Sequence, residues 1–410
     1  MKLITSHPTG NANVRAVLDG MYDAGILEAY YTAIATFKDT WADKLSGFGP
    51  QKELRRRRLD ARLQAVTHLS PWREMGRLLL QKAQLSLFKK HEASMFSVDS
   101  IYRGIDRKVA FELNRYSNID AVYAYEDGAL DSFKEAKRLG LQCLYDLPIG
   151  YWRAGRRLLE AEAEKWPEWA ATLVTFQDSN DKLARKDQEL GLADRIFVAS
   201  SFTAETLKDY PGQTAAVKVV PYGFPDVAGP RQYQLDRNKP LKLLFVGGLS
   251  QRKGIAGMFA AVEHFGKHVE LTVVGRKSVD DCAALNAALA KHEWIPSLPH
   301  AEILRTMRAH DVLLFPSLFE GFGLVITEAM AQGTPVITTE RTAGPDIIEH
   351  DRNGWIIRAG HQQELQDAIE KLIKNPRLIA EAGREAMRTA QRRPWHLYGN
   401  ELAQAIIHHA

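Results

Sequence analysis

Two glutamates, Glu320 and Glu328, stand eight positions apart around a loop at 321–323 with the sequence Gly-Phe-Gly. A strand that ends near Phe315 would lead into this loop, and a helix would follow at about 324–332. The first N–H groups of a helix have no partner inside it and can face an anion, of which phosphate is the obvious one. Carboxylates repel phosphate but accept hydrogen bonds, so the glutamates suit the ribose and sugar hydroxyls of a nucleotide sugar. The alternative is that both glutamates only solvate the loop and the helix that carry them.

A second glycine loop, at 247–254, follows a predicted strand and reads Gly-Gly-Leu-Ser-Gln-Arg-Lys-Gly. Glycines let the backbone come close to a ligand, and Arg252 and Lys253 add cationic groups where a diphosphate would sit. Cations at the start of a helix oppose its dipole unless an anion is present. We therefore predict that both side chains bind phosphate, the alternative being an exposed basic helix start.

The two loops resemble the signature of the retaining glycosyltransferases of family 4, in its Glu-x7-Glu region and its Gly-Arg-Leu-x-x-x-Lys-Gly element. The resemblance implies that Glu320 lies near the transferred sugar, that Glu328 binds the ribose and that Lys253 binds phosphate. Gly248 stands where many members have arginine, so Arg252 is the local candidate for that charge. Glu320, Lys253 and Arg252 are then candidate catalytic residues. The implied donor-binding residues are Gly248, Arg252, Lys253, Ile295, Glu320, Gly321, Phe322, Gly323, Leu324, Val325 and Glu328.

The rest of the chain alternates short β-branched or aromatic runs with longer helical patterns, which is typical of parallel α/β sheets. The predicted strands are 2–6, 121–125, 142–146, 195–200 and 217–221 in the first half and 241–247, 270–275, 312–315, 335–338 and 355–357 in the second. Prolines and glycines between Tyr222 and Pro240 predict a linker. We predict a first domain at 1–225, a linker at 226–240, a second domain at 241–390 and a C-terminal helix at 391–410.

The resemblance implies an α/β fold of the GT-B class. Two Rossmann-like domains would face a central cleft, and the C-terminal helix would cross back to the first domain. The donor would bind mainly to the second domain and the acceptor mainly to the first, in the crevice between them. The loop at 294–299 would wrap the base, with Ile295 in contact through its position rather than its side chain.

The first half offers candidates for the acceptor side. Gly10, Asn11 and Asn13 follow the first strand, where amides could bind sugar hydroxyls or a phosphate, the alternative being an ordinary strand-to-helix turn. Tyr125 and Tyr151 are further acceptor-binding candidates. The aromatic stretch 145–153 around Tyr151 would either line the cleft or pack in the core.

Glu126 and Asp127 stand where the family often carries a histidine that faces the transferred sugar, and that histidine is absent here. Burial raises the pKa of a carboxyl group, so either side chain could help an acceptor hydroxyl to lose its proton. Both are therefore candidate catalytic residues. Asp127 could instead cap the helix that follows it.

Composition fits a two-domain enzyme, since 410 residues exceed what one core usually supports. The net charge of +4 is too small to argue for nucleic acid. The two cysteines, Cys143 and Cys282, give no disulfide or metal framework, and no signal peptide or apolar run of about eighteen residues occurs. We therefore expect a cytoplasmic protein. The run Arg55–Arg58 predicts either contact with the inner face of an anionic membrane or a solvated helix face.

The resemblance implies hexose transfer with retention from a UDP- or GDP-sugar to a sugar, a lipid-linked sugar or a small molecule, in bacterial cell-surface polysaccharide or glycoconjugate synthesis. The departing diphosphate would help to remove the acceptor proton while Lys253 and Arg252 stabilise its charge, without a cofactor or a metal. A nucleotide-sugar epimerase of the same fold and a non-catalytic sugar-nucleotide-binding protein are the alternatives. A nicotinamide oxidoreductase is disfavoured because no G-x-G-x-x-G follows a predicted strand.

Overall fold

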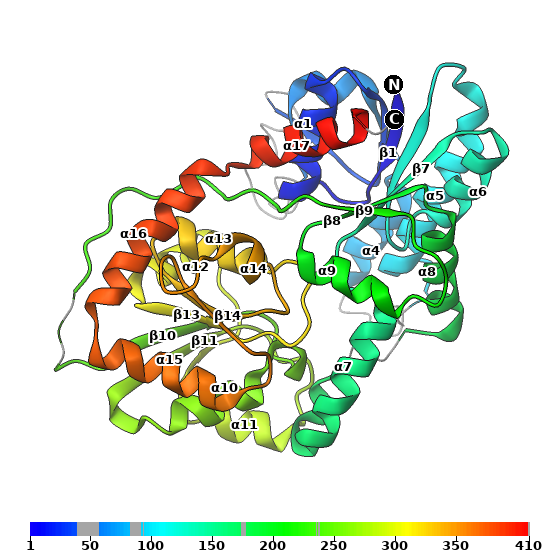
Figure 1. Ribbon diagram of the computed structural model, residues 1–410. Coiled ribbons are helices and arrows are strands. Elements are labelled where there is room, and N and C mark those ends of the chain that lie inside the picture. The colour runs from blue at the N-terminus through cyan, green and yellow to red at the C-terminus, as the bar shows by residue number, and fades with distance from the viewer. Residues whose placement is uncertain are drawn as a thin grey trace.

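The structure is a computed structural model that describes residues 1–38, 57–82, 92, 94–173, 178–234, 236 and 238–408. Its two larger sheets are parallel, one from each half of the chain, and helices cover both (Figure 1). A two-stranded sheet of β3 (Thr36–Phe37) and β4 (Arg58–Leu59) adds to the first half. Among the described residues, no helix has the length and apolar character needed to cross a membrane.

The first sheet has the strand order β5-β2-β1-β6-β7-β8-β9. Its strands are β1 (Leu3–Ser6), β2 (Leu27–Thr32), β5 (Thr67–Leu69), β6 (Ala121–Tyr125), β7 (Gln142–Leu147), β8 (Arg195–Val198) and β9 (Ala216–Val219). Its main helices are α1 (Ala12–Asp23), α4 (Trp72–Lys82), α5 (Val98–Glu112), α6 (Leu130–Arg138), α7 (Trp152–Lys165), α8 (Asn180–Leu192) and α9 (Ser201–Thr206).

The second sheet has the order β12-β11-β10-β13-β14-β15. Its strands are β10 (Leu241–Val246), β11 (Val269–Val274), β12 (Glu293–Ile295), β13 (Val312–Phe315), β14 (Val336–Thr339) and β15 (Trp355–Ile357). The helices of this half are α10 (Ile255–Glu263), α11 (Ala283–Leu289), α12 (His300–Ala309), α13 (Leu324–Ala331), α14 (Gly344–Ile347), α15 (Gln362–Lys374), α16 (Arg377–Arg392) and α17 (Trp395–Ile407).

All ten predicted strands are present, with ends shifted by two residues at most. The sequence analysis missed β2, where the exposed Glu28 interrupts an otherwise buried run, and the three-residue strands β5 and β12. No strand was predicted between 38 and 92, yet β5 pairs with β2 and extends the first sheet.

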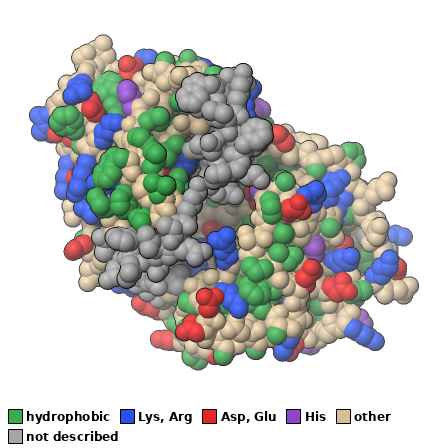
Figure 2. Space-filling view, turned by 180° about the vertical axis from the view of Figure 1, so that it is seen from behind, with side chains coloured by type: hydrophobic (Ala, Val, Ile, Leu, Met, Phe, Trp, Pro, Cys, Tyr) green, Lys and Arg blue, Asp and Glu red, His purple; other side chains and the backbone are tan. Residues whose placement is uncertain are grey.

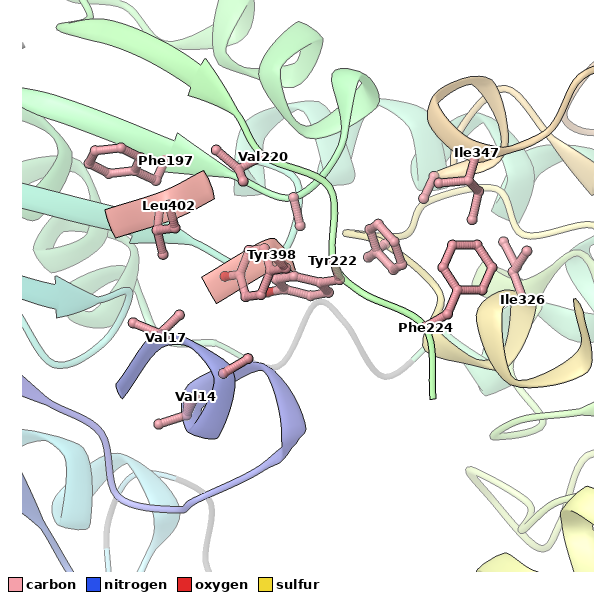
Figure 3. Close-up of a cluster of buried hydrophobic side chains, with 14 of the residues drawn as sticks. Val14, Val17, Phe197, Val220, Tyr222, Phe224, Ile326, Ile347, Tyr398 and Leu402 are labelled. Carbon is pink, nitrogen blue, oxygen red and sulfur yellow. The ribbon is translucent and has the colours of Figure 1, made fainter. Parts of the chain in front are cut away.

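The C-terminal helix α17 returns to the first half and packs along α1, as predicted. The two helices cross so closely that a Cβ added at Gly20 would lie 2.2 Å from the carbonyl oxygen of Gly399. Tyr398 of α17 meets Tyr222 edge to face, with 5.1 Å between ring centroids. Figure 3 shows this cluster continuing into the second half, through Tyr222 and Phe224 to Ile326 and Ile347.

An arm made of α7 and the 3-10 helix η5 (Pro167–Thr172) passes from the first half to the second. Figure 1 shows α7 running away from the first sheet toward α11. At its end Trp169 stacks on Phe259 of α10, with 5.9 Å between ring centroids, inside the second hydrophobic core. The predicted domain limits at 225 and 240 stay a prediction, but residues before 225 contribute to the core of the second half.

Candidate active site

The two glycine loops predicted to bind phosphate meet at the carboxyl ends of β10 and β13, which are neighbours in the second sheet. The chain leaves β10 toward β11 and later returns to β13 on its other side, so this is the switch point where open α/β sheets bind ligands. Gly254 holds the loops together: it has φ +70°, and a Cβ there would lie 2.1 Å from the carbonyl oxygen of Pro316. The amide of Leu318 also donates to the carbonyl of Arg252, at 2.9 Å.

Glu320 lies between the two predicted phosphate-binding cations. Lys253 forms an ion pair with its carboxylate, and Arg252 places Nη1 3.1 Å from the same Oε2 and 2.7 Å from the carbonyl oxygen of Phe319. Burial raises the pKa of Glu320, but the charges of Lys253 and Arg252 outweigh burial and hold it below its usual value. The trio therefore carries a net positive charge, which suits a diphosphate.

The loop that carries Glu320 presses against the first half of the chain. A Cβ at Gly321 would lie 2.0 Å from the carbonyl oxygen of Pro148. The carbonyl of Gly321 accepts hydrogen bonds from the hydroxyls of Ser200 and Thr203, at 2.5 and 3.0 Å. Gly323 then begins α13 as its N-cap, so the predicted helix at 324–332 is confirmed.

Glu328 lies on the second turn of α13, where its side chain is about three-quarters buried. His300 Nδ1 is 3.8 Å from its Oε1. Burial raises the pKa of Glu328 to about 7, so this carboxyl gains a proton near neutral pH. Leu324 and Val325, at the first turn of the same helix, are half-buried.

The remaining predicted donor residues have different surroundings. Gly248 is exposed, and a Cβ there would meet nothing within 4 Å, so the loop is open at this position. Phe322 is buried against Tyr222, with 4.8 Å between ring centroids. Ile295 lies in β12 rather than in a loop, and its carbonyl accepts from the amide of Gly275 at 3.0 Å.

In the first half, several acceptor candidates already have structural partners. Asn11 caps α1 by accepting from the amide of Val14, and the carbonyl of Gly10 accepts from Arg15. Asn13 is buried and donates to the Tyr222 hydroxyl at 3.4 Å. Tyr151 is buried, and its hydroxyl donates to Asp187 at 2.6 Å. This side chain therefore packs in the core and does not line the cleft.

Glu126 and Asp127 face helix α8. Lys186 Nζ lies 3.3 Å from Glu126, and burial, only partly opposed by Lys186, raises the pKa of Glu126 to about 7. Asp127 has φ +72° and lies 3.5 Å from Arg185. The interpretation of Asp127 as a helix cap was wrong, because Asp106 accepts from the amides at 131 and 132 that begin α6.

Comparison with known proteins agrees with this geometry. Residues 231–392 match the family model of the glycosyl transferases group 1. The matched segment is about two fifths of the chain and lies in its second half. It covers β10, β13 and both glycine loops, and so every predicted donor-binding residue.

Among curated relatives, the chain is 29% identical over 225 residues to a D-inositol 3-phosphate glycosyltransferase of Pseudarthrobacter chlorophenolicus, covering 50% of this chain and 53% of the relative. It is 30% identical over 150 residues to the amylovoran biosynthesis glycosyltransferase AmsK of Erwinia amylovora, covering 33% and 36%. The chain thus spans about half, or less, of the length of these relatives.

Solved structures match along the whole chain. Anabaena HepE in complex with UDP superposes with a TM-score of 0.63 at 17% identity, covering all of both chains. The lipopolysaccharide outer core galactosyltransferase WaaB gives 0.64 at 15% identity, again over both whole chains. At these identities the likeness concerns the fold, and the predicted GT-B fold is confirmed.

Two polar residues at the carboxyl ends of strands in the first sheet were not predicted. His7 follows β1, and its ring meets Tyr125 edge to face at 4.7 Å. Burial lowers the pKa of His7 to about 4, so the imidazole is neutral. Asp146, near the end of β7, accepts a hydrogen bond from Tyr123, and burial raises its pKa to about 7.

A positional signal for both residues was present in the sequence. Each stands at the carboxyl end of a predicted strand, the edge at which open α/β sheets bind ligands. Between them lies Tyr125, which is 3% exposed and whose hydroxyl finds no hydrogen-bond partner among the residues that the structure describes. His7, Tyr125 and Asp146 therefore form a polar group in the first half that the motif search did not identify.

Proposed function

We propose that this chain is a glycosyltransferase that moves a sugar from a nucleotide-diphosphate sugar to a hydroxyl acceptor. The observation that carries the proposal is the placement of Glu320 between Lys253 and Arg252 where two glycine loops meet. Two cations suit the diphosphate of a donor, and a carboxylate beside them suits the hydroxyls of the sugar attached to it. Glu328, on the same loop and helix, would accept the ribose hydroxyls.

The proposed chemistry is transfer with retention by attack from the front face of the sugar. The bond between the anomeric carbon and the diphosphate oxygen breaks, and a bond from that carbon to the acceptor oxygen forms on the same face. The acceptor proton passes to the departing diphosphate. Lys253 and Arg252 stabilise the charge that grows on the leaving group, which is where preorganised cations lower a barrier most.

The relatives support a uridine nucleotide and a polysaccharide product as the first choices to test. One structure of HepE holds UDP and glucose, and another holds UDP-glucose. The names of two relatives place them in amylovoran and capsular polysaccharide biosynthesis. For this chain we infer a UDP- or GDP-hexose donor and a bacterial cell-surface saccharide or glycoconjugate acceptor.

Binding of UDP-, GDP- and ADP-sugars to the whole protein would test the proposal, with slow donor hydrolysis followed in parallel. We expect one donor to bind the native protein and to bind Lys253→Ala and Glu328→Ala at least tenfold more weakly, since each loses a charged hydrogen bond to the ligand. Lys267→Ala and Glu270→Ala serve as matched controls. Both side chains are exposed and lie at the amino end of β11, whereas the glycine loops lie at the carboxyl ends of the strands. Absence of any binding at millimolar donor would contradict the proposal.

A further part of the proposal is contact with the inner face of a membrane near Arg55. Arg55 and Arg56 lie outside the described residues. Arg57 is 6% exposed and forms an ion pair with Glu74, so it is not available to lipid. The described part of this run does not form a helix face, since Arg58 lies in the strand β4.

A further inference from the structure

Exposed hydrophobic side chains concentrate on one small part of the first half. Of the nine large exposed hydrophobic residues in the described parts of the chain, seven lie between positions 69 and 111. Trp72, Met75 and Leu79 repeat at helical spacing on α4, so they form one stripe, with Trp72 54% and Leu79 64% exposed. The other four are Leu69, Met95, Val98 and Phe111.

The stripe continues onto residues at the start of α5 and just before it. Phe96 meets Trp72 edge to face at 6.3 Å, so the chain that carries Met95 and Val98 is held against α4. Figure 2, which views the molecule from behind, shows hydrophobic side chains gathered in the half that holds the first sheet, with Lys and Arg side chains at their margin. We call the exposed side chains of Trp72, Met75, Leu79, Met95 and Val98 the α4 face.

Cations border the α4 face while the nearby acids are withdrawn. Arg73 lies over the Trp72 ring, 4.8 Å from its centroid. Burial is the larger cause, and the nearby charges of Arg107 and Arg103 the smaller, of a lowered pKa for Arg73. Arg103 and Arg107 are themselves 43% and 58% exposed. Their ion-pair partners are Asp99, which is buried, and Asp131 of α6.

The acids of α4 and the first part of α5 are buried in ion pairs or helix contacts. Glu74 accepts from Arg57 and Arg77, Asp99 pairs with Arg185, and Asp106 accepts the amides that begin α6. The surface at this place is therefore apolar with a positive border. A helix with an exposed stripe of Trp, Met and Leu beside arginines is the chemistry of an interfacial helix that lies on an anionic bilayer.

We propose that the α4 face docks on an anionic lipid surface. Trp72, Met75 and Leu79 enter the headgroup region, and Arg103 and Arg107 meet the lipid phosphates. A second copy of this chain fits the face less well, because a two-fold contact would bring the arginines of both copies together while Glu74 and Asp99 stay buried. The inference does not depend on the glycosyltransferase proposal.

Co-sedimentation of the whole protein with vesicles tests this inference. We expect binding to phosphatidylcholine vesicles that contain phosphatidylglycerol, weaker binding without it, and loss of binding as salt rises, because salt screens the charges. The double variant Trp72→Ser/Leu79→Ser and the double variant Arg103→Gln/Arg107→Gln should each bind about tenfold more weakly. Because these side chains are exposed, both variants should keep the native thermal midpoint.

Two controls separate the α4 face from general effects. Lys267→Gln/Arg305→Gln removes the same charge from exposed positions of the second half, and Tyr22→Ser removes an exposed ring from α1; both should bind like the native protein. Equal binding to both kinds of vesicle, or native binding by both α4-face variants, would overturn the inference. So would a dimer without lipid that the Trp72→Ser/Leu79→Ser variant abolishes, since the occupant would then be a second copy.

Discussion

The two sides of the candidate active site are built in opposite ways. In the second half, the charged side chains come from two continuous loops and pair with one another, as Lys253 and Arg252 do with Glu320. In the first half, His7, Tyr125 and Asp146 come from three different strands and are buried among aromatic rings. A site made of short continuous segments leaves a motif in the sequence, whereas one assembled across strands leaves only the position of each residue at a strand end.

The largest expected effect comes from the contact that joins the two sides. Gly321→Ala places a methyl group against the backbone of Pro148, which cannot move aside as a side chain would. We expect a loss of about 3 kcal/mol in the free energy of unfolding, measured by denaturant titration, and weaker donor binding. Gly229→Ala is the matched control, because a Cβ there meets nothing within 4 Å and Gly229 lies outside both glycine loops. Equal losses in the two variants would mean that the approach of the halves does not constrain the loop.

A smaller effect is expected at Asp146, whose folded pKa is about 7 because it is buried, against 3.8 ordinarily. Between these values the folded protein holds a proton that the unfolded chain has released, so stability falls as pH rises and the loss is complete above pH 7. Asp146→Asn removes this titration. Relative to the native protein, the variant should gain about 2–3 kcal/mol in unfolding free energy between pH 5 and pH 8.

A flat difference between the two proteins over this pH range would mean that Asp146 is ionised in the folded state. It would then resemble Glu320, which its cationic neighbours keep charged, and the contrast between the two sides would disappear. Glu340→Gln is a suitable control, because this glutamate is partly exposed on the other half of the chain.

Glu328 carries the contrast into the donor side itself, since it is buried without the cations that Glu320 has. Its pKa of about 7 means that the ionised fraction rises between pH 6 and pH 8. If the carboxylate accepts the ribose hydroxyls, donor affinity should rise about tenfold over this range. Glu328→Gln should bind more weakly with no such dependence. Titration calorimetry at three pH values would measure it, and an equal rise in the variant would assign the dependence to another group.

The smallest effect is expected at Tyr125. Its buried hydroxyl lacks a partner among the described residues, so Tyr125→Phe removes an unsatisfied polar atom and should leave the unfolding free energy unchanged or slightly higher, within about 0.5 kcal/mol. Tyr151→Phe is the contrasting variant, because it removes a hydrogen bond to Asp187 and should cost about 1 kcal/mol. A larger loss in Tyr125→Phe would indicate a partner for its hydroxyl.

The sequence was informative where local pattern decides structure. Buried strands with β-branched residues, the glycine loops, the helix that starts after Gly323 and the apolar face of α17 were all predicted within two or three residues. Partners far apart in the chain were not. Nothing near Arg57 in the sequence indicates that it will form a buried ion pair with Glu74. Nothing near Asp127 indicates that Asp106 and Glu189 accept the hydrogen bonds from the amides at the start of α6.

The arm that ends in Trp169 and the helix α17 each cross from one half of the chain to the other. Together they determine what happens when the chain is cut between the two halves. Trp169 of the first half packs in the core of the second half, and Tyr398 and Leu402 of the second half pack in the core of the first. Such a reciprocal exchange is the arrangement that holds domain-swapped partners together. After a backbone cut within 222–240, each fragment would still be packed into the core of the other, so the two should copurify as a nicked protein. Either fragment made alone would expose the hydrophobic surface that the missing fragment covers.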